Sequence, residues 1–113
     1  MLVYEEPVPI DRATAEAEFA SGDVGRTCRA LVAVAFHEPD GAWVEGWCLR
    51  FLAHRKPDVR RLAATCLGHV ARIHGRLADG RVMAALQAGL GDSEIAGEVE
   101  EALADIHQYV GRS

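Results

Sequence analysis

The chain has 113 residues, half of them hydrophobic, and carries a formal net charge of −5 at pH 7. This length suits a single domain over residues 1–113 that can bury a core. The apolar residues are mostly Ala, Leu and Val, and only 6% of residues are aromatic, which favours packed helices over a sheet sandwich. The acidic balance makes nucleic acids and anionic membranes unlikely partners and suits a basic protein.

Turn and cap residues divide the chain into six predicted helices. Prolines at positions 7 and 9 make residues 1–10 an irregular lead-in. Asp11 and Asp23 are candidate helix caps, and Pro39-Asp40-Gly41 is a turn signal. We expect helices over residues 12–20, 24–37, 42–54, 57–76, 81–90 and 94–110. Because the chain has no strand-length alternating run and no Asn-Gly hairpin, the predicted fold class is all-α.

The fourth predicted helix has the clearest apolar pattern. Its apolar residues recur at i, i+3, i+4, i+7 and i+8, which is typical of one buried helix face. The members of this stripe are Val59, Leu62, Ala63, Cys66, Leu67, Val70 and Ile73. The stripe predicts that one face of this helix is buried.

Two similar helix starts suggest a structural repeat. Asp23-Val24-Gly25-Arg26 is followed 35 positions later by Asp58-Val59-Arg60-Arg61. A period of this length with two helices per unit is typical of repeat proteins. We therefore expect stacked antiparallel pairs, the second helix with the third and the fourth with the fifth, and a capping first helix. The alternative is an ordinary six-helix bundle.

The candidate nucleophiles and metal ligands do not form a recognisable site. Cys28, Cys48 and Cys66 are widely spaced, odd in number and without a CxxC pair. They are expected to be reduced core residues, which indicates a cytoplasmic protein. No two of the five histidines are i, i+4 neighbours, and no HExxH or phosphate loop is present. We predict no enzyme activity, no catalytic residues, no cofactor and no metal. No apolar run approaches the roughly 18–20 residues needed to span a bilayer.

The segments 58–74, 82–86 and 97–106 together carry a family resemblance. Over roughly residues 23–108 the chain resembles small bacterial HEAT-like repeat proteins. Some of these resemble immunity proteins of contact-dependent growth-inhibition (CDI) and related toxin systems. The resemblance implies an α-solenoid of about six helices that binds a cognate, basic toxin domain in the cytoplasm and occludes its active site.

The resemblance assigns no contact residues, so side-chain chemistry must suggest them. Tryptophan is a favoured interface anchor, and acids suit a basic partner. Glu45 and Arg50 lie off the main apolar stripe of the third helix and are expected to be exposed. The predicted protein-binding residues are Asp40, Trp43, Glu45, Trp47, Arg50, Asp92 and Glu94. For both tryptophans the alternative is a place in the core.

Three other functions fit some of the same features. A generic HEAT-like adaptor would use the same surfaces for another protein. A binder of the nucleic-acid backbone would use the basic cluster Arg55, Lys56, Arg60 and Arg61. A HEAT-like lyase for linear tetrapyrroles would need a cavity with convergent polar groups. Exposed tryptophan would also be consistent with a homodimer.

Overall fold

The computed structural model describes residues 7–111, and this part of the chain is helical apart from short connections. Its helices are α1 (Arg12–Phe19), α2 (Val24–His37), α3 (Gly41–Phe51), α4 (Pro57–His74), α5 (Arg81–Gly89) and α6 (Ala96–Tyr109). The all-α prediction is confirmed. Residues 7–10 are irregular, as expected, and the remainder of the predicted lead-in, residues 1–6, lies outside the described residues.

Aspartate side chains cap the N-termini of α1, α2 and α3. The carboxylate of Asp11 accepts a hydrogen bond from the Thr14 N–H at 2.7 Å, and that of Asp23 accepts one from the Arg26 N–H at 2.8 Å. Asp40 caps α3 in the same way through the Trp43 N–H at 3.2 Å. Each side chain satisfies a backbone donor that has no partner within the helix.

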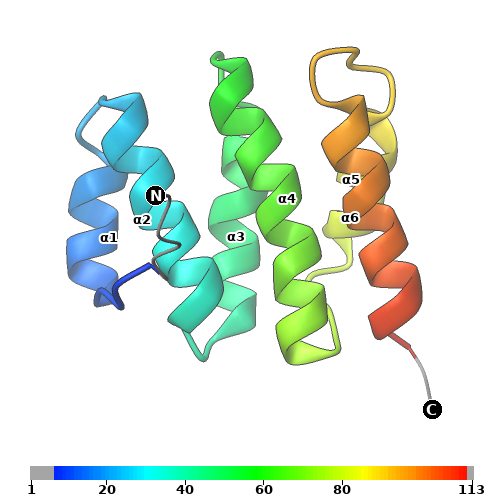
Figure 1. Ribbon diagram of the computed structural model, residues 1–113, viewed down its shortest axis with the longest axis horizontal. Coiled ribbons are helices and arrows are strands. Elements are labelled where there is room, and N and C mark those ends of the chain that lie inside the picture. Colours follow the sequence, from blue (N-terminus) through cyan, green and yellow to red (C-terminus); the bar gives the residue numbers. More distant parts are fainter. Residues whose placement is uncertain (1–6, 112–113) are drawn as a thin grey trace, which may run out of the picture.

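Helix α4 is the centre of the arrangement, and it packs against α2, α3 and α6. Helices α2, α4 and α6 lie side by side, while α3 lies behind α4 and α5 behind α6 (Figure 1). Helix α1 packs against α2 at one end. The core therefore lies between two layers of helices, with the fully buried Val59, Leu67 and Val70 of α4 inside it.

The pairing of the helices differs from the predicted one. Helix α3 packs more extensively on α4 than on α2, and α5 packs chiefly on α6. Helix α4 also packs closely on α6, through a row of small residues that the apolar stripe did not include. Ala64, Gly68 and Ala71 are all buried, and they let α6 approach closely.

Helices α4 and α6 are in very close contact at Gly68. A Cβ added there would lie 3.0 Å from the Cα of Ala102 and 2.8 Å from Oδ2 of Asp105.

The buried face of α4 is shorter than the predicted apolar stripe. Ile73 near the end of α4 is 48% exposed, and Leu62 is only half-buried. The burial predicted for Ile73 is wrong: this side chain is exposed, although Val70 and Ala71 in the same part of α4 are fully buried.

Replacing Gly68 by alanine should destabilise the protein. The added methyl group must push α6 outward, and overpacking of this kind costs about 1–3 kcal/mol, only partly offset by about 1 kcal/mol of helix propensity. The control is Gly46→Ala in α3, where an added Cβ has no neighbour within 4 Å. Urea unfolding should show a loss of stability at Gly68 and a gain at Gly46. Equal effects at the two positions would contradict the close packing.

Acid should weaken the cap at Asp40. The hydrogen bond from the Trp43 backbone, followed by that from Arg12, lowers the pKa of this carboxyl below its usual value of 3.8. Its contribution to stability is therefore complete above about pH 4 and is lost as the pH falls below that value. Asn caps about as well as Asp but does not titrate. The difference in melting temperature between wild type and Asp40→Asn should shrink from pH 5 to pH 2. A constant difference would refute this role.

Candidate functional site

The tryptophan residues of α3 line a surface groove. Trp43, Trp47 and Arg50 form one wall, and Ala42, Gly46 and Leu49 of the same helix complete that side. Glu16 of α1 and Arg81 of α5 border the groove as well, and its volume is about 560 Å³. We call this site the α3 groove. It brings together three of the seven predicted contact residues.

Both tryptophans are half-buried, so each has a core side and an exposed side. The Trp47 ring packs on Phe19 of α1 with 4.6 Å between ring centroids and meets the Trp43 ring edge-on at 6.3 Å. The guanidinium of Arg50 lies over Trp47 at 4.4 Å from the ring centroid, and that of Arg12 lies over Trp43 at 5.0 Å. The tryptophans are thus held rigidly by aromatic and cation–π contacts.

Glu45 is not at the surface, and its predicted exposure is wrong. The residue is 1% exposed, and its carboxylate accepts hydrogen bonds from the backbone N–H groups of Ala78 at 3.1 and 3.0 Å and of Asp79 at 2.9 Å. These donors belong to the connection between α4 and α5. Glu45 therefore fixes that connection to α3 and is removed from the set of contact residues.

The predicted loop acids have arginine partners and do not share one surface. Asp40 forms an ion pair with Arg12 at 2.9 Å, while Arg60 contacts both Asp92 at 3.2 Å and Glu94 at 3.1 Å. Asp40 lies in the α2–α3 connection and the other two acids lie in the α5–α6 connection, at the opposite end of the helices (Figure 1).

Two residues of the basic cluster 55–61, Arg60 and Arg61, already form hydrogen bonds and ion pairs within the chain. Besides its two acids, Arg60 donates to the carbonyl oxygens of His54 at 2.9 Å and Arg55 at 3.1 Å. Arg61 pairs with Asp58 and donates to the carbonyl oxygen of Glu94 at 3.1 Å. Two of the four basic residues proposed to contact phosphates are thus already engaged, which weakens the nucleic-acid alternative.

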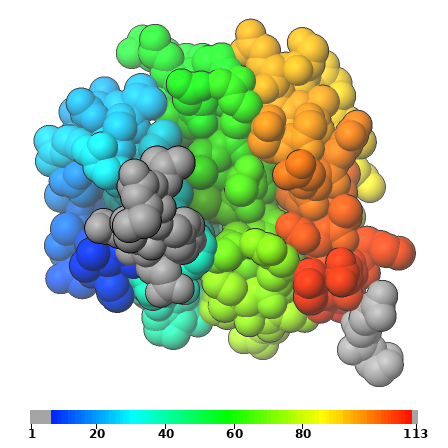
Figure 2. All heavy atoms as spheres, in the orientation of Figure 1, coloured from blue at the N-terminus to red at the C-terminus, as the bar shows by residue number. Residues whose placement is uncertain are grey.

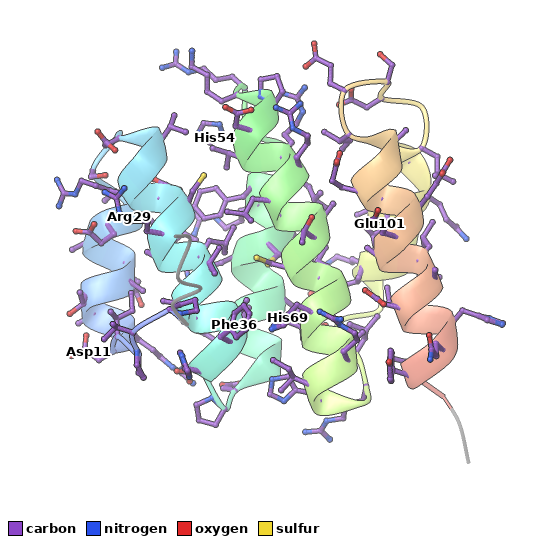
Figure 3. All side chains as sticks on the ribbon, in the orientation of Figure 1. Asp11, Arg29, Phe36, His54, His69 and Glu101 are labelled. Carbon is purple, nitrogen blue, oxygen red and sulfur yellow. The ribbon has the colours of Figure 1, made fainter. Side chains whose placement is uncertain are left out.

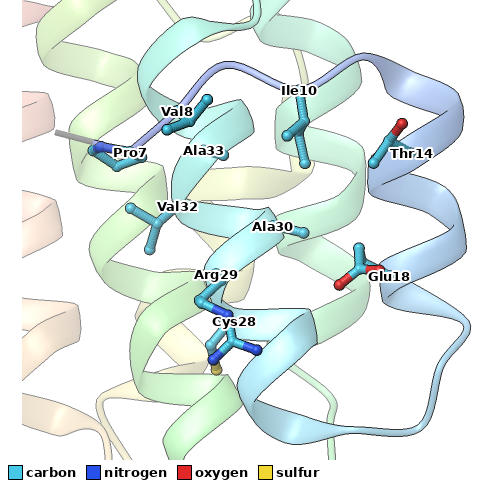
Figure 4. A pocket seen from close by; sticks show the side chains of 10 residues that line it. All are labelled: Pro7, Val8, Ile10, Thr14, Glu18, Cys28, Arg29, Ala30, Val32 and Ala33. Carbon is cyan, nitrogen blue, oxygen red and sulfur yellow. The ribbon is translucent and has the colours of Figure 1, made fainter.

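Two further grooves were not expected from the sequence. One, of about 640 Å³, lies between residues 7–10, α1 and α2 and is mostly apolar, with Val8, Ile10 and Val32 along it (Figure 4). The other, of about 360 Å³, lies between α4 and α6, where Figure 2 shows a furrow between green and orange atoms. Thr65, Glu101 and Asp105 line it.

The acids of α6 have few partners. Arg72 approaches Asp105 at 3.9 Å, but Glu98 and Glu101 take part in no ion pair within residues 7–111. Glu101 is on the face seen in Figure 3. This exposed acidic face is the main competitor of the α3 groove for a basic partner.

The cysteines and histidines described below have packing roles and do not form a reactive site. Cys48 and Cys66 are buried free thiols, and their mutual hydrogen bond followed by burial raises the pKa of Cys48 well above its usual value. Such thiols are poor nucleophiles. His69 packs on Phe36 with 4.0 Å between ring centroids, and the two side chains meet in Figure 3.

Across residues 7–111 no group of three or more His, Cys, Asp or Glu residues is placed to hold a metal ion. In the same range no helix has the length and hydropathy to cross a membrane.

Sequence reasoning missed several residues of the α3 groove. Ala42 and Gly46 form a small-residue row, i and i+4, beside the two tryptophans, and this spacing was a usable signal. Glu16 and Arg81 come from other helices, so no pattern within α3 could reveal them.

A chain of a solved structure is similar to this chain in fold and in sequence. The chain matches a chain of the crystal structure of the CDI complex from Cupriavidus taiwanensis LMG 19424 with a TM-score of 0.81 and 30% sequence identity. The match covers 96% of this chain and 98% of that chain. No protein-family model matches the chain, and no curated protein matches it.

Substitution of Glu45 should reduce stability although the residue belongs to a surface helix. In Glu45→Gln the amide oxygen can keep the Oε1 position and accept from Ala78 and Asp79, but the charge and the acceptor at Oε2 are lost and an N–H group then faces the Ala78 N–H, at a cost of about 1–3 kcal/mol. Glu100→Gln, at an exposed position of α6, is the matched control and should change stability little. Urea unfolding of the two variants provides the measurement. A Glu45→Gln variant as stable as the control would contradict the structural role.

Proposed function

This chain belongs to the same protein family as the matched chain of the CDI complex, and on that premise we propose that it is an immunity protein that binds and neutralises a cognate toxin domain. The observation that carries the proposal is the match in fold and sequence over nearly the whole of both chains. A likeness of this extent within a CDI complex supports a protein partner more strongly than fold alone would.

The surface chemistry is consistent with binding to a protein. The α3 groove presents two half-buried tryptophans and an arginine, and these residue types carry most of the binding energy in protein interfaces. The rings are already held in place by Phe19 and by cation–π contacts. Little side-chain entropy is then lost on binding. We propose Trp43, Trp47 and Arg50 as the central contacts, with Asp40 at one edge.

The helix contacts support a HEAT-like architecture. The pairs α1 with α2, α3 with α4 and α5 with α6 pack against one another, and their second members α2, α4 and α6 lie side by side. We infer three stacked pairs in this register, one helix earlier than the sequence suggested. A stack of this kind forms an extended rigid surface, which suits an inhibitor that blocks an active site by covering it.

Charge supports a basic toxin. The net charge is −5, and residues 82–111 hold six Asp or Glu residues and no Lys or Arg. A field of this sign speeds the encounter with a basic protein and makes the association rate depend on salt. Free buried thiols fit a reducing compartment, so we place this interaction in the cytoplasm.

The proposal predicts a stoichiometric complex that competes with the substrate of the toxin. The test uses the purified chain and a candidate cognate toxin domain with a measurable activity. Occlusion should raise the apparent KM of the toxin as the chain is added, without changing kcat, because substrate and inhibitor exclude one another.

Other outcomes favour other functions. An affinity for the toxin domain that saturating substrate does not weaken at equilibrium would refute occlusion while retaining immunity. Failure to bind the toxin domain, together with capture of a different protein, would favour an adaptor. Duplex binding that falls steeply with added salt would favour the nucleic-acid alternative.

A further inference from the structure

We infer that the α3 groove accepts one apolar side chain of the toxin domain, and that a carboxylate beside this side chain pairs with Arg50. The inference rests on the proposed function, which supplies a protein partner, and it adds the chemistry of the contact. It predicts an Asp or Glu next to an apolar residue at the centre of the toxin surface.

The groove is hollow because two of the residues that line it, Ala42 and Gly46, are small. Ala42 and Gly46 lie one turn apart on α3, next to Trp43 and Trp47. A Cβ built on Gly46 would have no neighbour within 4 Å, so the space above this residue is empty in the folded chain. Aromatic rings beside an empty site form a pocket for an apolar side chain, which is how interface anchors are usually held.

Among the three arginines in or beside the groove, Arg50 alone has no ion-pair partner within residues 7–111. Arg81 forms an ion pair with Asp79 at 2.8 Å, and Arg12 is engaged by Glu38 and Asp40, both at 2.9 Å. Arg50 is exposed, and within residues 7–111 its guanidinium forms neither a hydrogen bond nor an ion pair.

The stacked geometry of Arg50 selects a carboxylate. The Trp47 ring holds the guanidinium through its face, which leaves the N–H donors at its edge free for a fork-like contact. Glu16, on the α1 side of the groove, repels a carboxylate there. A partner carboxylate is therefore directed to the Arg50 side. The groove thus has a negatively charged side at Glu16 and a positively charged side at Arg50.

The test compares variants that fill the groove with variants that do not. Gly46→Gln places a side chain in the empty space, and it should weaken toxin binding at least about tenfold without lowering the unfolding midpoint. Gly97→Gln is the matched control, because an added Cβ there also has no neighbour within 4 Å but lies on α6. Arg50→Lys keeps the charge and loses the fork, so it should weaken binding as well. Titration calorimetry with the purified toxin domain gives the affinities.

The outcomes separate this inference from the proposed function. Wild-type affinity in Gly46→Gln would overturn the groove while leaving toxin binding intact. Loss of binding in Glu98→Ala and Glu101→Ala, with Gly46→Gln unaffected, would place the toxin on α6. A wild-type dimer that dissociates in Gly46→Gln would assign the groove to a second copy of this chain. A wild-type chain that binds no toxin domain would overturn both.

Discussion

The close approach of α4 and α6 is the constraint on which the arrangement depends. At Gly68 the two backbones leave no room for a single methyl group, and α4 contacts α2 and α3 at the same time. The position of α4 therefore fixes both layers. Helix α3, which carries the tryptophan groove, also packs on α4. The contact between α4 and α6 therefore helps to position the groove, although no residue of the groove takes part in it.

The helices themselves could be predicted well, because their signals are local. Asp11 and Asp23 act within three residues of their own position, and the buried Val59, Leu67 and Val70 repeat along one helix. The choice of neighbours is not local. It depends on how closely small residues such as Gly68 let a distant helix approach, and a repeat of similar caps does not contain that information.

The candidate site was predictable in part for the same reason. Trp43, Trp47 and Arg50 were found because their chemistry stands out on α3. Glu45 was misplaced because its hydrogen-bond donors lie 33 and 34 positions further along the chain, and an acid off the apolar stripe normally faces water. Likewise, the arginine partners of Asp40 and Asp92 come from α1 and α4, beyond the reach of any spacing rule.

The empty space above Gly46 has a consequence for how such a protein can evolve. The groove can be reshaped by a side chain added at Gly46, because a Cβ there would meet no other atom within 4 Å. Most changes of binding specificity carry a penalty in folding, which limits the sequences that selection can explore. Here the groove can diverge step by step with a changing partner while the helical scaffold stays the same.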